Sequence, residues 1–159
     1  MVNYRYLICG VVLEVLYRGI RVLSRTDSRV KQELMDMPEG RTIRFAVAPD
    51  EKAPALCFTV KNGTIQKAKK NVRPEVDSVF KNEKMAFRVF TGRMGIAGAY
   101  GAHAFTLRGN INETMGVVRI VDLVEGYLFP KFIAKHILKE IPEKEYPTPL
   151  LYLRLIPGC

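Results

Sequence analysis

Apolar residues recur every three or four positions through the first part of the chain, which predicts an amphipathic helix over residues 4–25. Its apolar face would consist of Cys9, Leu13, Leu16, Ile20 and Leu23. Its opposite face would carry Glu14, Arg18, Arg21, Arg25 and Arg29. Such a charged face either contacts water or lies on an anionic membrane surface. The apolar run over residues 7–16 is too short to span a bilayer and lacks a cleavage site, so we expect it in the mature protein.

A shorter helix is expected next, because Thr26, Asp27 and Ser28 supply capping side chains. Its inward side would consist of Val30, Leu34 and Met37. The pattern then changes to alternation, which predicts strands at residues 42–47, 55–60, 64–66, 76–80 and 104–108. The dipeptide Asn62-Gly63 predicts a tight hairpin between the second and third of these strands.

Helical patterns return in the second half of the chain. We expect helices over residues 83–92, over residues 112–128 with Asn112 as cap, and from Pro130 to about residue 141 with one face formed by Ile133, Ile137 and Ile141. Between the first two lie Gly92, Gly95, Gly98 and Gly101, small residues that predict close backbone packing or a mobile lip. A stiff exposed linker is expected at Pro142, Pro147 and Pro149.

The apolar tail over residues 150–156 could add a strand, fill a pocket or meet a partner. We therefore divide the chain into an N-terminal helix (1–26), a central domain (27–141) and a linker with an apolar tail (142–159).

Composition fits a globular protein with a real core, since 48% of the 159 residues are hydrophobic and 26% are charged. The net charge of +9 favours anionic partners, which include membrane headgroups, nucleic acid and acidic ligands. Three cysteines, Cys9, Cys57 and Cys159, have no spacing typical of a disulfide framework or a zinc site. We therefore expect a reducing, cytoplasmic location.

A basic cluster follows the third strand and consists of Lys67, Lys69, Lys70 and Arg73. No aromatic residue alternates with these cations, so the cluster lacks the stacking surface of a single-strand binder. Lysines at a strand edge more simply prevent edge-to-edge association. Because no known nucleic-acid-binding motif accompanies the cluster, we do not expect nucleic acid as a partner.

No arrangement of residues indicates catalysis. None of the three serines lies in a G-x-S-x-G motif, and His103 and His136 have no metal-ligand spacing. We expect His136 at the surface, and His103 either at the surface or at a pocket mouth. Asp122 and Glu125 flank the apolar stripe of their helix and are expected to face solvent. We therefore expect no enzyme activity, no cofactor and no metal.

Residues 92–110 contain an ordered set of motifs: Gly92-Arg93-Met94, then Ala99-Tyr100, then a strand and turn over 105–110. This order resembles sterol carrier protein 2 (SCP2) domains, which commonly carry G-K-[LM], four variable residues, A-F, two more residues and G-K-L-x-I-x-G-D. Three positions depart from that pattern: His103, where glycine is usual, Ala104, where a basic residue is usual, and Asn110, where aspartate is usual. The resemblance covers about residues 27–128.

What the resemblance implies is an α/β (α+β) fold: a mixed, mainly antiparallel sheet of about five strands, with helices on one face and an apolar tunnel between the layers. The family binds sterols, fatty acyl chains and related lipids without chemistry, and some bacterial members support lipid or quinone metabolism. We therefore expect non-enzymatic binding and transfer of a sterol, fatty acyl or isoprenoid lipid. The alternative is an accessory module with a closed pocket, in a lipid- or quinone-metabolising complex, for which a homodimer would be evidence.

The large apolar side chains from residue 85 onward are the candidates for the cavity wall, because a lipid cavity needs such a lining. They are Met85, Phe87, Phe90, Met94, Ile96, Tyr100, Phe105, Leu107, Val117, Val121, Val124 and Leu128. Each of them could equally be an ordinary core residue, since burial has the same sequence signature in both cases. Peripheral contact with anionic membrane would use Arg18, Arg21 and Arg25.

Overall fold

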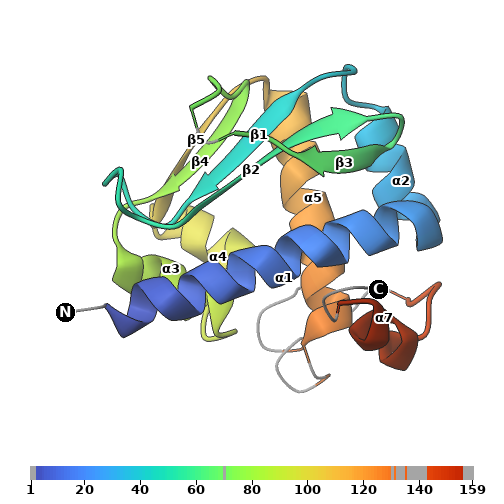
Figure 1. Cartoon of the computed structure of the whole chain (residues 1–159). Coiled ribbons are helices and arrows are strands. Elements are labelled where there is room, and N and C mark those ends of the chain that lie inside the picture. Colours follow the sequence, from blue (N-terminus) through green and yellow to red (C-terminus); the bar gives the residue numbers. More distant parts are fainter. Residues whose placement is uncertain (1–2, 70, 130, 132–134, 136–142, 156–159) are drawn as a thin grey trace.

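The alternating segments form one five-stranded sheet (Figure 1). We describe it from a computed structural model that covers residues 3–69, 71–129, 131, 135 and 143–155. The strands are β1 (Thr42–Ala46), β2 (Ala55–Lys61), β3 (Thr64–Lys67), β4 (Val76–Phe80) and β5 (Phe105–Arg108). Their order is β3-β2-β1-β4-β5, with β1 and β4 parallel and all other neighbours antiparallel. The expected mixed, mainly antiparallel sheet is confirmed.

The hairpin between β2 and β3 turns at the expected dipeptide. Asn62 and Gly63 have φ angles of 52° and 71°. Two successive positive φ angles define the turn whose twist matches that of paired strands, and asparagine and glycine adopt such angles most easily. The local chemistry of two residues therefore determines where the chain reverses.

Helices gather on one face of the sheet (Figure 1). The longest, α1 (Tyr4–Thr26), lies across this face and contacts β2, β3 and most of the other helices. All five residues of its predicted apolar face are buried, which confirms that prediction. A Cβ at Gly19 would lie only 3.1 Å from Cγ1 of Val124, so glycine allows α1 to approach the last long helix closely.

The short helix α2 (Ser28–Met35) begins as the sequence predicts. Oδ1 of Asp27 accepts hydrogen bonds from the backbone N–H groups of Arg29 and Val30. These bonds satisfy donors that have no partner within the helix. The predicted inward side, Val30, Leu34 and Met37, is buried.

The glycine-rich segment differs from expectation because part of it is helical. After α3 (Glu83–Phe90) the chain leaves the helix at Gly92, with φ of 72°, and then forms α4 (Ile96–Gly101). Burial of Ile96 and Ala99 stabilises this turn of helix against the core, although its glycines have low helix propensity.

Gly109 and Asn110 form the start of α5 (Ile111–Leu128). Gly109 has a φ of 134°, and a Cβ there would lie 2.6 Å from the carbonyl oxygen of Glu75. Oδ1 of Asn110 accepts a hydrogen bond of 2.9 Å from the backbone N–H of Asn112. The expected cap at Asn112 is therefore wrong by two residues. Asparagine caps a helix as well as aspartate does, so the departure from the family pattern leaves the cap intact.

The apolar tail forms a helix, α7 (Thr148–Leu155), in which Leu151 is fully buried. The linker expected at Pro147 and Pro149 is thus the start of this helix. The carbonyl of Pro147 accepts hydrogen bonds from the N–H groups of Leu150 and Leu151. Most of the helix expected between Pro130 and residue 141 lies outside the described residues, as do Lys70, His136, Pro142 and Cys159.

Candidate functional site

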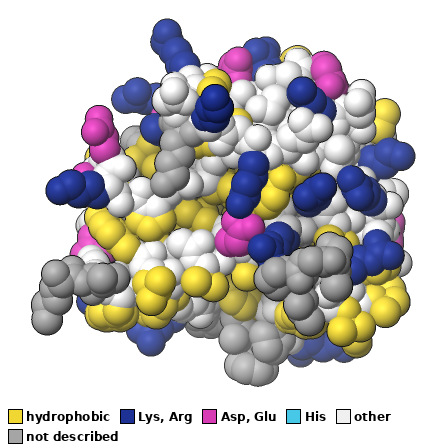
Figure 2. Space-filling view, viewed as in Figure 1, with side chains coloured by type: hydrophobic (Ala, Val, Ile, Leu, Met, Phe, Trp, Pro, Cys, Tyr) yellow, Lys and Arg dark blue, Asp and Glu magenta, His cyan; other side chains and the backbone are white. Residues whose placement is uncertain are grey.

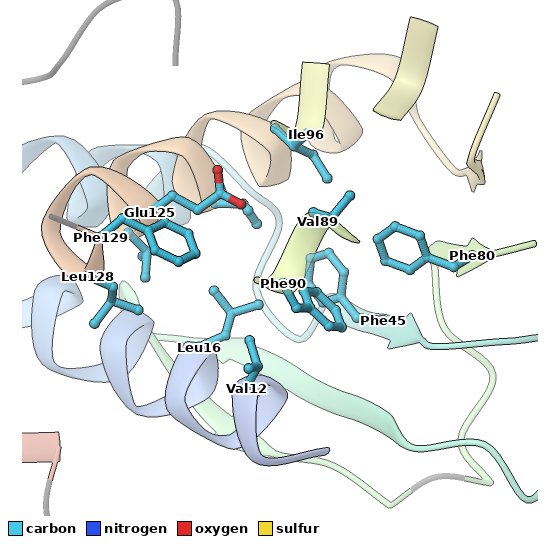
Figure 3. Close-up of a pocket in the computed structure, with 12 residues that line it drawn as sticks. Val12, Leu16, Phe45, Phe80, Val89, Phe90, Ile96, Glu125, Leu128 and Phe129 are labelled. Atoms are coloured by element: carbon cyan, nitrogen blue, oxygen red, sulfur yellow. The ribbon is translucent and has the colours of Figure 1, made fainter. Parts of the chain in front are cut away.

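An apolar hollow lies between the sheet and the helices (Figure 3). Its wall takes residues from α1, β1, β4, α3, α4 and α5. They are Val12, Leu16, Phe45, Phe80, Val89, Phe90, Ile96, Val121, Val124, Glu125, Leu128 and Phe129. Because these residues come from segments far apart in the chain, only the packing of the helical layer on the sheet brings them together.

Strand alternation explains how the sheet contributes to the hollow. Phe45 and Phe80 point to the helical side, and Arg44 and Asp77 point to the other side, where they form a bidentate ion pair with distances of 2.8 and 2.7 Å. The ring of Phe80 packs against Phe90 with a centroid distance of 5.5 Å. Aromatic side chains therefore form the end of the hollow next to β4.

The hollow is much smaller than a lipid cavity. Its free volume is about 50 Å³, whereas cavities that hold small ligands typically measure about 300–1,000 Å³. The expected continuous tunnel is therefore reduced to a narrow space in this conformation. Any ligand larger than a few heavy atoms would have to displace wall side chains.

The predicted cavity residues fall into three groups. Five of the twelve line the hollow: Phe90, Ile96, Val121, Val124 and Leu128. Six pack in or against the core: Met85, Phe87, Met94, Phe105, Leu107 and Val117. Tyr100 is 60% exposed, and its ring contacts Phe105 at 6.1 Å between centroids.

Seven wall residues were not among the sequence candidates: Val12, Leu16, Phe45, Phe80, Val89, Glu125 and Phe129. Of these seven, helical spacing had already placed Leu16 on the apolar face of α1. What the pattern lacks is any sign of which inward side chains border an empty space.

Glu125 is the main correction to the sequence analysis. It was expected to face solvent, but its side chain is only 7% exposed and lines the hollow. Its Oε2 atom is buried without a hydrogen-bond partner in the described part of the chain. Helix α5 is covered on several sides, by α1, α2 and α4, so the buried surface is wider than the predicted stripe.

Burial also changes the protonation of two carboxyl groups on this helix. It raises the pKa of Glu125 to about 8, and the negative charge of Asp122 adds to the effect. Asp122 is partly buried, and desolvation raises its pKa to about 6. At neutral pH Glu125 is therefore mainly protonated, which makes it a hydrogen-bond donor as well as an acceptor.

The outward face of α1 has two distinct halves. At 100° per residue, the exposed side chains of Tyr4, Leu7, Ile8 and Val11 lie on the same side as the three arginines expected to contact membrane. Arg21 and Arg25 are exposed, whereas Arg18 pairs with Glu14 at 3.1 Å and donates a hydrogen bond to the carbonyl of Leu155. Figure 2 shows hydrophobic side chains beside the first turns of α1 and basic ones along its second half.

Two other predicted features have a structural explanation. His103 is exposed and has a φ of 52°, a left-handed conformation that explains why the resembling family usually has glycine there. Lys67 of the basic cluster pairs with Glu14 from α1, with 2.5 Å between Nζ and Oε2, and lies over the ring of Tyr17. Part of the cluster's charge is thus used within the fold.

The described part of the chain contains no recognisable metal site and no helix that could span a membrane. Among them, no group of three or more His, Cys, Asp or Glu side chains could hold a metal ion. Of the helices described, none is long and apolar enough to cross a bilayer.

Comparison with solved structures identifies the architecture. A structure described as "UbiJ-SCP2 Ubiquinone synthesis protein" matches with a TM-score of 0.50 and 12% identity, covering 77% of this chain and 100% of that chain. The apo form of sterol carrier protein 2 from Yarrowia lipolytica matches with a TM-score of 0.45 and 10% identity, covering 70% and 88%. No protein-family model and no curated protein matches the sequence significantly. The first of these likenesses shows that the chain has an SCP2-like fold.

Proposed function

We propose that the chain binds an apolar lipid between its sheet and its helices and transfers it without chemical change. The observation that supports this proposal is the wall of the hollow, in which eleven of the twelve lining residues are apolar. Each CH₂ group moved from water into such surroundings contributes about 0.8 kcal/mol, so a sterol, fatty acyl or isoprenoid ligand needs no elaborate motif.

Binding requires the hollow to widen, and the fold offers a place for this. Val12, Phe90, Leu128 and Phe129 line the hollow but are only partly buried, so their side chains can move outward into solvent. Displacing them costs less than separating the fully packed core on the other side. We expect ligand entry at this junction of α1, α3 and α5.

Transfer also requires contact with the membrane that holds the lipid. We propose that the outward face of α1 makes this contact at the cytoplasmic surface, with its apolar first half inserted between headgroups and Arg21 and Arg25 near anionic lipids. The net charge of +9 supports attraction to such a surface.

The proposal is tested by native mass spectrometry of the full chain purified from cells and after loading with lipid. We expect an additional mass that corresponds to a bound lipid. Val12→Phe would fill the hollow from its partly buried edge and reduce the loaded fraction severalfold. Val72→Phe adds the same ring at a 43% exposed loop position and is the matched control. A wild-type chain that carries no lipid after any loading would overturn the proposal.

A second function is favoured by the small volume of the hollow, about 50 Å³. In this alternative the same fold is an accessory module of a lipid- or quinone-metabolising complex, a role suggested by the ubiquinone synthesis protein whose fold is similar. A lipid-free mass together with a stable dimer would favour the module over the carrier.

A further inference from the structure

The hollow has one polar group in its described wall, the carboxyl of Glu125. The side chain is 93% buried, since only 7% of it is exposed, and Oε2 has no hydrogen-bond partner among the described residues. In Figure 3 the carboxyl end lies on the side of the hollow where Ile96 and Phe129 are drawn. A lone carboxyl group is thus buried in the wall of a space that is otherwise enclosed by hydrocarbon.

Burying this carboxyl oxygen lowers the stability of the fold unless a hydrogen-bond partner is bound to it. A buried polar atom without a partner is unfavourable, and native proteins contain few of them. A leucine at position 125 would extend the apolar stripe of α5 and pack without that cost. The simplest explanation for the unsatisfied oxygen is therefore that a bound molecule supplies its hydrogen-bond partner.

The surroundings of Glu125 define the charge of that molecule. The described lining residues include no lysine, arginine or histidine that could neutralise an anion. The rest of the hollow's wall is apolar: Val12 and Leu16 of α1, Phe45 and Phe80 of the sheet, and residues of α3 and α4. The ionisable group that acts on it is Asp122, one turn earlier on α5. An ionised headgroup would therefore lose its hydration without gaining a counter-ion.

We propose that Glu125 is the anchor for an uncharged, oxygen-bearing headgroup, a hydroxyl or a carbonyl, on an otherwise apolar ligand. The protonated carboxyl donates a hydrogen bond to the ligand oxygen, and the apolar wall surrounds the remainder. This inference rests on the proposed function, and it narrows the ligand class to neutral lipids such as alcohols, ketones or quinones rather than free fatty acids.

Support comes from the acid–base state of the site. Burial and the charge of Asp122 raise the pKa of Glu125 to about 8, so the donor is present at neutral pH and is lost in alkaline solution. Binding of a ketone or quinone, whose oxygen can only accept a hydrogen bond, should therefore weaken as the pH rises above 8, although the ligand itself does not titrate.

The test uses the full chain with three probes of twelve carbon atoms, 1-dodecanol, 2-dodecanone and dodecanoate, below their aggregation concentrations. Affinities are measured by calorimetry at pH 6.5 and 9 for wild type, Glu125→Gln, Glu125→Leu and the control Glu51→Gln, which alters an exposed glutamate in the turn after β1. Circular dichroism checks that each variant is folded.

At pH 6.5 we expect wild type to prefer dodecanol over dodecanoate by about tenfold or more, the equivalent of one hydrogen bond. Glu125→Leu loses about tenfold in dodecanol affinity, and Glu51→Gln is unchanged. Wild type binds 2-dodecanone, which can only accept a hydrogen bond, more weakly at pH 9, whereas Glu125→Gln keeps a donor and shows no such dependence. If Glu125→Leu does not fold, the comparison of wild type with Glu125→Gln at the two pH values tests the anchor instead.

Equal dodecanol affinity of wild type and Glu125→Leu, or a wild-type preference for dodecanoate, would overturn the anchor and leave lipid binding itself intact. Failure of wild type to bind any of the three probes would overturn the proposed function and the anchor with it. The two failures are therefore distinguishable.

Discussion

The hydroxyl of Tyr127 donates a hydrogen bond of 2.6 Å to Oδ2 of Asp27, a residue one hundred positions earlier in the chain. Both side chains are buried, and Asp27 also caps α2 and pairs with Arg29 at 2.8 Å. The same hydroxyl accepts hydrogen bonds from the backbone N–H groups of Glu145 and Tyr146, at 2.8 and 3.2 Å. One phenol therefore links the α1–α2 corner, α5 and the segment that leads to α7.

Removing this hydroxyl should loosen the C-terminal segment. In Tyr127→Phe, Asp27 loses a buried donor and two N–H groups lose their acceptor, so we expect a loss of about 1–3 kcal/mol in the free energy of unfolding. Urea unfolding measures the loss, and limited proteolysis should show earlier cleavage within residues 143–155. Tyr100→Phe, at a 60% exposed position, is the control. Unchanged stability and unchanged cleavage would contradict this role.

Stability should depend on pH through Glu125. Its pKa is raised to about 8 in the folded chain from an ordinary value near 4.5, so the folded state holds a proton that the unfolded state releases. The contribution of Glu125 to the free energy of unfolding is therefore most favourable below pH 4.5 and falls as the pH rises towards 8, on the order of 1.4 kcal/mol for each unit of pKa difference.

The variant Glu125→Gln removes this titration. Denaturant unfolding of wild type and variant between pH 4.5 and 9 should give curves that diverge with rising pH, with the variant relatively more stable in alkaline solution. The raised pKa of Asp122, about 6, adds a smaller dependence that both proteins share. Parallel curves would mean that Glu125 ionises freely in the folded state.

Gly109 should tolerate no side chain. Its φ is 134°, and a Cβ would lie 2.6 Å from the carbonyl oxygen of Glu75, so Gly109→Ala should cost about 2 kcal/mol or more in the free energy of unfolding. Gly101→Ala is the matched control, because a Cβ there meets no atom within 4 Å. Thermal or urea unfolding of both variants checks the prediction, and an equal effect at the two positions would refute it.

The membrane contact proposed for α1 depends on its exposed apolar residues. Leu7 is 62% exposed, so Leu7→Glu should leave the fold intact but reduce binding to vesicles that contain phosphatidylglycerol by about tenfold, since a buried leucine contributes about 1.5–3 kcal/mol. Flotation of vesicles with bound protein measures the effect. Met35→Glu, at a 59% exposed position on α2, is the control. If both variants bind as wild type does, this face of α1 is not the contact.

The positions of the secondary-structure elements could be predicted because they depend on neighbours in the chain. Asp27 caps α2 through bonds to the next residues, Asn62 and Gly63 turn a hairpin, and the alternating segments form the strands of the sheet. The helix in the glycine-rich segment could not be predicted in this way, because α4 is stabilised by the burial of Ile96 and Ala99 rather than by helix propensity.

The amino-acid sequence by itself determined the order of the five strands and of helices α1, α2, α3 and α5, the buried faces of α1 and α2, and the likeness to an SCP2-like fold. Tertiary structure alone decided that Glu125 lies inside, that Tyr127 meets Asp27, and that the space between the layers is about 50 Å³. The reason is physical: a periodic pattern reports which side of an element avoids water, whereas the size of a hollow and the partners of a buried polar atom depend on how several distant elements pack together.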